Sequence, residues 1–391
     1  MPKLIAGLAS IAATMLAVSS AAAQGTVKVG LIMSYSGQFA DPSSQMDNGV
    51  KLYMKQHGDT VAGKKIEIIR KDDGGINPPL AKRLAQELIV RDKADILAGF
   101  TNSPNGFAAA DVSQDAKKFT VMMLAATSAI ITHSHYQVRA SFTIPANVGT
   151  LGTWAAKSGI KRAYVMTTDY APGHDAETAF SAAFKAGGGE VVGSVRMAVA
   201  NPDFSAYVQR AKDLNPEAIF VFIPGGTQPA SLAKALAERG IDTKKVKVMT
   251  TGEMVDEQPL KSMGDAALGI ISGWHYDISH KSKMNEEFVK AYVDMFHRNP
   301  DFFALGGYDG MHVIYEALKK TKGNADGQAL VDAAKGMSWE SPRGPMSLDP
   351  KTGDVVQTVY IRRVEKVGGK LENVEIAKFP AVKDPLSIEK K

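Results

Sequence analysis

The chain has 391 residues, a formal net charge of +5, 45% apolar and 22% charged residues, and no cysteine. This length provides for one large or two medium globular domains, and the scattered basic residues do not form the stripe typical of nucleic-acid-binding proteins. The absence of cysteine excludes disulfides, thiol catalysis, cysteine-ligated zinc and a lipid anchor on cysteine.

Residues 1–23 have the pattern of a secretory signal peptide. Lys3 precedes an apolar run, and three alanines, 21–23, come before Gln24. A membrane anchor is the alternative, since the run is nearly long enough to span a bilayer. The small-residue ending and the lack of a basic flank favour cleavage, so we expect an exported, periplasmic protein.

Strands and helices alternate through the next part of the chain. Short apolar, β-branched runs predict strands at 27–33, 64–70, 95–99 and 119–124, with helices at 43–57, 78–92 and from about 104. Such alternation is typical of parallel sheets covered by helices.

A second series of the same kind follows Pro145. Helices are expected at 148–158, 173–186, 204–214 and 228–239, and strands at 162–167, 190–197, 217–223 and 245–250. A further strand around 267–276, helices at 284–298 and 304–321, and a tail of antiparallel strands complete the chain.

This order of elements predicts an α/β protein with two doubly wound parallel-sheet lobes joined by a multi-segment hinge. We expect lobe 1 to contain 24–145 and 277–340, and lobe 2 to contain 146–276 and 341–391.

Polar turns join the predicted strands to the helices that follow them. Such turns lie where open parallel sheets bind ligands, and each helix N-terminus there favours an anion. Ser103, before Pro104, is predicted to be an N-cap with proline at the first helical position. Ser103 could serve only as a cap, but several polar turns on consecutive strands point to a site for a carboxylate.

Other chemistries find little support in the motifs. There is no P-loop, no glycine-rich dinucleotide motif, and no nucleophile elbow around Ser103. We expect no metal and no cofactor, although two histidine groups leave a metal site open: His133 with His135, and His275 with Asp277 and His280.

Two acidic residues, Asp175 and Glu253, leave open a catalytic role and a site for a ligand ammonium group. His174 and Asp175 at a helix start fit a cap better than a catalytic dyad. Glu253, in the turn after the strand at 245–250, would suit a ligand ammonium group, but a solvated loop glutamate is an equal alternative.

The chain resembles the Leu/Ile/Val-binding family of periplasmic solute-binding proteins, which serve ATP-driven (ABC) importers and have the type I periplasmic-binding fold. The resemblance spans the mature chain and rests on these segments: KVGLIMSYSGQFA, NGVKLYM, GKKIEIIRKDDGG, AKRLAQELI, ILAGFTNS, LAATS, TDYAPGHD, FIPGG and GGYDGMHVIYEAL. It implies a non-enzymatic protein, expected to be a monomer, that binds a small solute between its lobes and delivers it to a membrane permease.

The resemblance also implies roles for particular residues. Ser103 matches the serine that holds the ligand carboxylate, Ala125 and Thr127 match contacts on the next turn, and Glu253 matches the acid that meets an amino acid's ammonium. On the same turns we expect further contacts from Asn102, Gln38, Tyr170 and Ala171. The following aromatic side chains are expected to shape the pocket: Phe39, Phe100, Tyr170, Trp274 and Tyr276.

Two departures from the family pattern bear on the ligand. Pro172 and Gly225 stand where amino acid binders carry an aromatic residue. The leading hypothesis is a binding protein for a branched-chain or other amino acid. The alternatives are an aromatic carboxylate of the benzoate or cinnamate type, urea or a short amide, and, more remotely, an exported amidase or a sensory domain.

Overall fold

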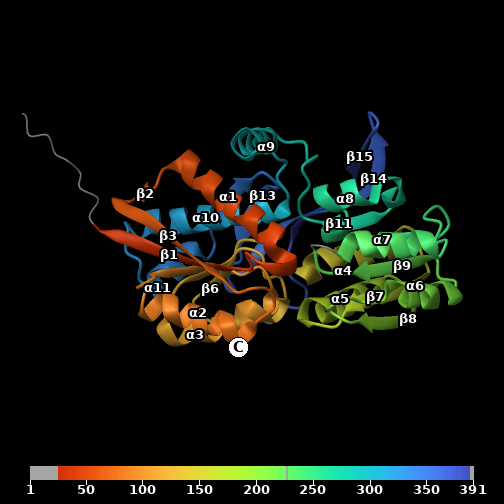
Figure 1. Ribbon diagram of the computed structural model, residues 1–391, viewed down its shortest axis with the longest axis horizontal. Coiled ribbons are helices and arrows are strands. Elements are labelled where there is room, and N and C mark those ends of the chain that lie inside the picture. Colours follow the sequence, from red (N-terminus) through yellow and green to blue (C-terminus); the bar gives the residue numbers. More distant parts are fainter. Residues whose placement is uncertain (1–24, 226–227, 388–391) are drawn as a thin grey trace, which may run out of the picture.

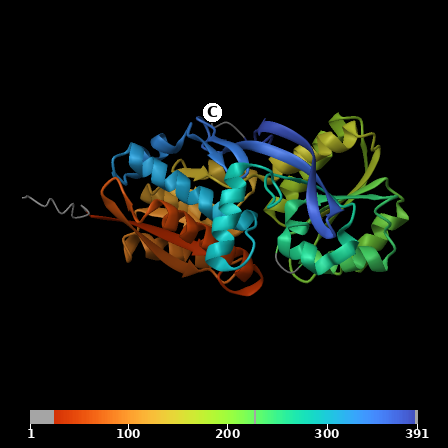
Figure 2. The same cartoon turned by 90° about the horizontal axis from the view of Figure 1, so that it is seen from above.

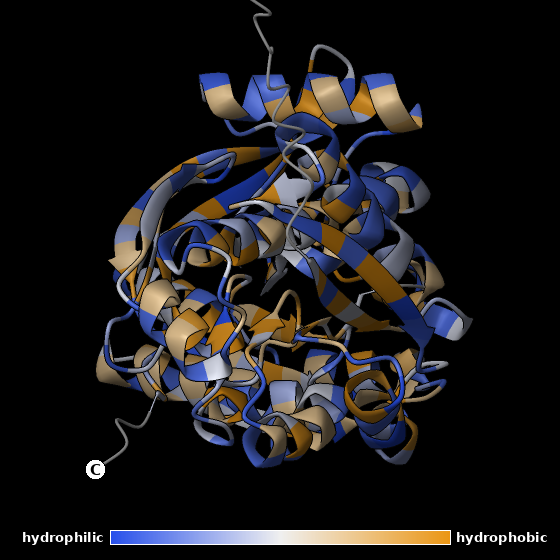
Figure 3. Cartoon of the chain, turned by 90° about the vertical axis from the view of Figure 1, so that its left-hand side faces the viewer, coloured by the Kyte–Doolittle hydropathy of each residue, from blue (hydrophilic) through white to orange (hydrophobic). Residues whose placement is uncertain are grey.

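The computed structural model describes residues 25–225 and 228–387, and in it the chain forms two lobes that lie side by side (Figure 1, Figure 2). The predicted signal peptide falls outside these residues. The lobes are defined by two separate sheets, of six and nine strands. Figure 3 shows hydrophobic segments along the inner strands, whereas the outlying helix α9 (Lys283–Phe296) carries both hydrophilic and hydrophobic residues.

The first sheet is parallel apart from one short edge strand. Its strands lie in the order β2 (Thr60–Val61), β3 (Lys64–Asp72), β1 (Thr26–Met33), β4 (Ile96–Gly99), β5 (Thr120–Met122) and β6 (Gln137–Arg139). Only the pairing of β2 with β3 is antiparallel. The helices of this lobe are α1 (Ala40–His57), α2 (Pro78–Val90), α3 (Ser103–Ala116), α9, α10 (Phe302–Lys320) and α11 (Gly327–Ala334).

The second sheet has a parallel half and an antiparallel half. Its order is β12 (Ser338–Ser341), β13 (Gly344–Leu348), β14 (Val355–Val367), β11 (Ile271–Trp274), β10 (Lys247–Thr251), β9 (Ala218–Phe222), β7 (Arg162–Thr168) and β8 (Glu190–Met197), with β15 (Lys370–Val382) paired to β14. Its helices are α4 (Ile144–Lys157), α5 (Ala171–Ala186), α6 (Phe204–Asp213), α7 (Gln228–Glu238) and α8 (Glu257–Met263). The predicted fold class and the antiparallel tail are thus confirmed.

Each sheet contains a point at which the strand order reverses. The chain runs outward from β1 to β3 and then back across to β4, and it does the same from β7 to β8 and back to β9. Ligands of open α/β sheets bind beyond the carboxyl ends of the strands at such points. The two lobes therefore present two such edges, and the site lies where these edges face each other.

Three segments connect the lobes, after β6, after β11 and after α11. The strand β12 already belongs to the second sheet, because Trp339 pairs with Met346 of β13. We therefore propose lobe boundaries at about 140–143, 275–282 and 335–337, the last of them a few residues before the predicted position.

Two glycines let α1 and α10 pack closely in the first lobe. A Cβ on Gly49 would lie 1.9 Å from the carbonyl oxygen of Ala304, and one on Gly307 would lie 2.0 Å from that of Met46. Neither position tolerates a side chain without separating the helices. This contact fixes the start of α10, which carries Phe303 to the edge of the cleft.

Candidate functional site

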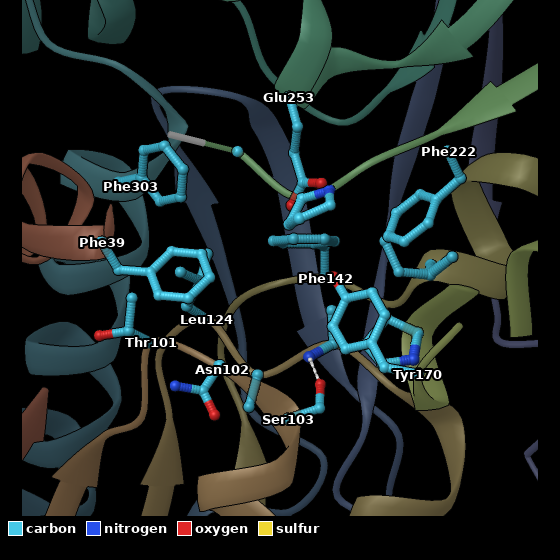
Figure 4. A pocket seen from close by; sticks show the side chains of 16 residues that line it. Phe39, Thr101, Asn102, Ser103, Leu124, Phe142, Tyr170, Phe222, Glu253 and Phe303 are labelled. Atoms are coloured by element: carbon cyan, nitrogen blue, oxygen red, sulfur yellow. Dashed lines mark hydrogen bonds between the residues drawn. The ribbon is translucent and has the colours of Figure 1, made fainter. Parts of the chain in front are cut away.

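A cleft between the lobes is lined by turns that follow the carboxyl ends of strands in both sheets (Figure 4). About 40 Å³ within it is open to the centre of a water-sized sphere. The first lobe contributes Phe39, Thr101, Asn102, Ser103, Leu124, Ala125, Ala126 and Phe303; the segment between the lobes and the second lobe contribute Phe142, Ile144, Tyr170, Pro172, Phe222, Pro224, Gly225 and Glu253.

Ser103 lies at the N-terminus of α3, but it is not the N-cap that its position before Pro104 predicts. Asn102 is the cap, since its side-chain oxygen accepts the N–H of Asn105 at 3.0 Å. Ser103 Oγ instead accepts the N–H groups of Ala126 at 3.1 Å and Thr127 at 3.2 Å. A hydroxyl has one proton to donate, so two accepted bonds leave that proton for a ligand acceptor.

Asn102 lines the cleft, but its polar atoms serve the protein. Besides capping α3, its amide donates to the carbonyl oxygen of Gly75 at 3.3 Å. The neighbouring Thr101 hydroxyl accepts the N–H of Ser34 at 3.1 Å and bonds Ser43 at 2.8 Å. Thr101 and Asn102 therefore line the cleft next to Ser103, with their polar groups bonded to the protein itself.

Ala125 and Thr127, on the turn after β5, have their polar groups occupied. The Ala125 N–H donates to the carbonyl oxygen of Phe100 at 3.0 Å, and its carbonyl accepts from Arg139 at 3.3 Å. The Thr127 hydroxyl donates to Asp175 of α5 in the other lobe, which also accepts the N–H of Ser128 at 2.8 Å. Thr127 thus connects the lobes and is not among the lining residues.

Gln38 and Ala171 do not line the cleft, but residues adjacent to them in the chain do. Gln38 is exposed, and Phe39 beside it is buried and lines the cleft. Ala171 begins α5 without lining the cleft, whereas Tyr170 and Pro172 on either side of it do. The structure thus brings the neighbours of Gln38 and Ala171 to the cleft, and contacts from these two residues themselves stay a prediction.

Five aromatic side chains line the cleft, and the sequence predicts two of them, Phe39 and Tyr170. The other three are Phe142, Phe222 and Phe303. Tyr170 and Phe222 stack with ring centroids 6.1 Å apart. The expected pocket residues Phe100, Trp274 and Tyr276 are fully buried in the core, with Trp274 packed behind Phe142 at 4.6 Å.

Glu253 lies on a short 3₁₀ turn, η3 (Gly252–Met254), directly after β10. Its Oε2 atom is buried and has no hydrogen-bond partner among the described residues. Burial alone raises the pKa of this carboxyl to about 8. Figure 4 shows it extending into the cleft from the side opposite Ser103.

The charge balance of the cleft is unusual for an anion site. Among the described lining residues none is lysine, arginine or histidine, and Glu253 is the one carboxyl. The same burial, together with the charge of Glu253, raises the pKa of Tyr170 well above its usual value. A bound carboxylate would therefore depend on hydroxyl and N–H dipoles and not on an ion pair.

The histidines singled out by the sequence have other partners. His174 bonds Asp169 at 2.7 Å, while Asp175 points to Thr127, so the two do not form a dyad. The ring of His275 stacks on Phe142 at 4.5 Å. Within residues 25–225 and 228–387 no group of three or more metal-binding side chains comes together, and no described helix is long and apolar enough to cross a membrane.

Two α/β lobes that enclose a cleft at the switch points of both sheets define a two-lobed solute-binding protein. Residues 26–370 match the family model described as periplasmic binding protein, and the chain belongs to that family. It is a periplasmic solute-binding component of an ABC transporter, as the resemblance implied.

The similarity to known proteins extends over nearly the whole chain. A Leu/Ile/Val-binding protein homolog 6 from Brucella melitensis is 39% identical over 383 residues, 96% of this chain and 98% of that protein. Two solved structures are ABC-transporter solute-binding proteins from Rhodopseudomonas palustris. One, from strain BisB5 in complex with 3,4-dihydroxybenzoic acid, is 53% identical with a TM-score of 0.89 and covers 92% of this chain and 99% of that one. The other, from strain HaA2 in complex with p-hydroxybenzoic acid, is 40% identical with a TM-score of 0.89 and covers 92% and 98%.

Proposed function

We propose that this protein captures an aromatic carboxylate of the benzoate class and delivers it to a membrane permease. The observation that carries this proposal is the lining of the cleft: five aromatic side chains from both lobes surround it, with no basic side chain among the described lining residues. Aromatic rings pack favourably against a flat ring in offset or edge-to-face arrangements.

The carboxylate of the ligand is assigned to the Ser103 end. There the hydroxyl proton of Ser103 and the positive end of the α3 dipole would meet the negative charge. Ser103 is 2% exposed, so water does not compete strongly for its hydroxyl. Charge-assisted hydrogen bonds of this kind are about twice as strong as neutral ones.

A branched-chain amino acid is the second candidate, because the Brucella relative is named for such ligands. Its ammonium group would need an ionised Glu253, and burial in the cleft favours the protonated carboxyl. The two Rhodopseudomonas proteins, at 53% and 40% identity, are in complex with hydroxylated benzoic acids. The aromatic acid is therefore the better supported ligand.

We propose no catalytic role for the cleft. His174 and Asp175, which together with Glu253 kept an amidase open, have separate partners: His174 bonds Asp169, and Asp175 bonds Thr127 in the first lobe. Neither is among the described residues that line the cleft with Glu253. We further propose that the protein is a monomer, and that it lies in the periplasm after its signal peptide has been cleaved.

Thermal unfolding against a ligand panel tests the proposed ligand class. The panel holds benzoate, 4-hydroxybenzoate, cinnamate, L-leucine, L-valine and urea. A ligand at a hundred times its Kd stabilises by about 2.7 kcal/mol, which raises the midpoint measurably. We expect a rise with benzoates alone. A rise with leucine or valine and none with the aromatic acids would refute the proposal.

A further inference from the structure

We propose that Glu253 is the specificity-determining residue for a hydroxyl group on the ring of the ligand, at the end opposite the carboxylate. The ligand would then be a 4-hydroxybenzoate in preference to benzoate itself. This inference rests on the proposed function and deepens it.

The placement of Glu253 is the first support. Ser103 belongs to the first lobe and Glu253 to the second, and Figure 4 shows them at opposite ends of the cleft with the aromatic rings between them. A flat ring bound with its carboxylate at Ser103 directs its para position toward Glu253. The carboxyl and the ring substituent would therefore meet when the lobes close.

The turn that carries Glu253 packs closely against a buried indole ring. A Cβ on Gly252 would lie 2.2 Å from Cγ of Trp274, so the backbone is pressed against that indole ring. Trp274 in turn packs on Phe142, which lines the cleft. A carboxyl on such a turn is held in place before the ligand arrives, which lowers the entropic cost of binding.

The hydrogen-bonding capacity of the carboxyl is the second support. Its Oε2 atom is buried without a partner in the described part of the chain, which costs free energy until a ligand supplies one. A protonated carboxyl has one donor and spare acceptors, and a phenolic hydroxyl has one of each, so the two groups can satisfy each other. Benzoate would leave the carboxyl unpaired.

An ammonium group satisfies the carboxyl less well. It has three donors and no acceptor, and it requires the charged form of Glu253, which burial disfavours through a pKa raised to about 8. The neutral carboxyl surrounded by aromatic rings therefore matches a hydroxyl better than an amine.

The test compares Kd values for benzoate and 4-hydroxybenzoate, measured by calorimetry on the wild-type protein and on two variants. Glu253→Gln keeps a donor and an acceptor at the site, and Glu253→Met removes both at similar size. We expect the wild-type protein and E253Q to prefer 4-hydroxybenzoate by roughly tenfold or more, the cost of leaving a buried polar group unpaired. E253M should lose that preference while still binding benzoate.

The control variant is Glu238→Gln, an exposed glutamate at the end of α7 in the same lobe, which should behave as the wild-type protein does. The inference is overturned if the wild-type protein binds both acids equally, or if E253M keeps the full preference. Either result leaves the binding of aromatic acids intact. Failure to bind any aromatic acid would instead refute the proposed function, and this inference with it.

Discussion

Ser103 connects two turns of the first lobe and still has a proton to donate. Its Oγ accepts the N–H groups of Ala126 and Thr127, which orients the hydroxyl proton away from both. The residue thus acts both as a structural link and as the group assigned to the ligand carboxylate. A serine in this arrangement is oriented before the ligand binds.

Ser103→Ala should weaken binding of 4-hydroxybenzoate by about 1.5–3 kcal/mol, roughly tenfold to a hundredfold in Kd, because a hydrogen bond to a charged group is lost. Calorimetric titration measures the change. The matched control is Ser113→Ala on the same helix, since the Ser113 hydroxyl is buried but bonds Lys118 and Ser134 far from the cleft. Equal affinity losses in both variants would contradict the assigned role.

Glu253 should make the binding of benzoate depend on pH. Its pKa is raised from 4.5 to about 8, so the carboxyl is neutral below that pH and charged above it. A charged Glu253 repels a second anion in the cleft, so affinity should fall as the pH rises through about 8. In E253Q this fall should be absent. Affinity for benzoate that instead rises with pH would contradict the placement of Glu253 beside the bound anion.

At the scale of elements, the first turn of α5 holds the second lobe to the first. Asp175 accepts the Thr127 hydroxyl and the Ser128 N–H, and both donors lie on the other lobe. Asn299 of the first lobe likewise donates to Glu257 of α8 at 2.7 Å. Hydrogen bonds across the cleft form only when the lobes are closed, so they favour the ligand-retaining state.

Asp175→Ala should speed the release of ligand roughly thirtyfold, because two hydrogen bonds of the closed state, each worth about 1 kcal/mol, are lost. Stopped-flow displacement of a bound aromatic acid measures the rate. Asp169→Ala is the control, since Asp169 lies near Asp175 in the chain but its side chain is exposed and bonds His174 of the same lobe. Unchanged release from the Asp175 variant would show that this contact does not retain ligand.

The sequence predicts the longer elements well because their apolar periodicity is strong. It misses β6 (Gln137–Arg139), because only one of its three residues is apolar and the other two, Gln137 and Arg139, are polar side chains that are buried all the same. It also misses the start of α4, where Thr143 caps a helix that begins four residues before its predicted start at 148. Capping side chains, and not hydrophobic pattern, set such boundaries.

The site is predictable only in part. The turns after parallel strands lie at one edge of a sheet, and this rule is enough to predict that Ser103, Tyr170 and Glu253 lie near a ligand site. All three line the cleft. Phe142, Phe222 and Phe303 stand singly in distant segments, and only the packing of the two lobes brings them together. The Thr127–Asp175 contact is hidden for the same reason, because it joins two lobes whose orientation no local pattern encodes.

At the scale of the molecule, three buried arginine–aspartate pairs lie where the chain passes between the lobes. They are Arg139 with Asp354 at 2.9 Å, Arg343 with Asp309 at 2.6 Å, and Arg362 with Asp277 at 3.0 Å. Arg343 also donates to the carbonyl oxygens of Ala140 and Ser141. These contacts hold the segments that connect the lobes against the second lobe, since Arg343 and Arg362 both belong to it.

Arg343→Met should destabilise the protein by about 3–5 kcal/mol, since it leaves Asp309 as a buried charge without its partner. Denaturant unfolding measures the loss. The double variant Arg343→Met with Asp309→Asn should recover part of it, because the uncompensated charge is removed as well. A single variant as stable as the wild-type protein would show that the pair does not hold the connecting segments.

We propose that the cleft between the lobes takes an aromatic carboxylate. Isothermal titration of the wild-type protein at neutral pH with 4-hydroxybenzoate, and separately with L-leucine, tests it most directly. We expect saturable binding of 4-hydroxybenzoate at one site per chain and no detectable binding of leucine. Saturable binding of leucine, with none of the aromatic acid, would contradict it.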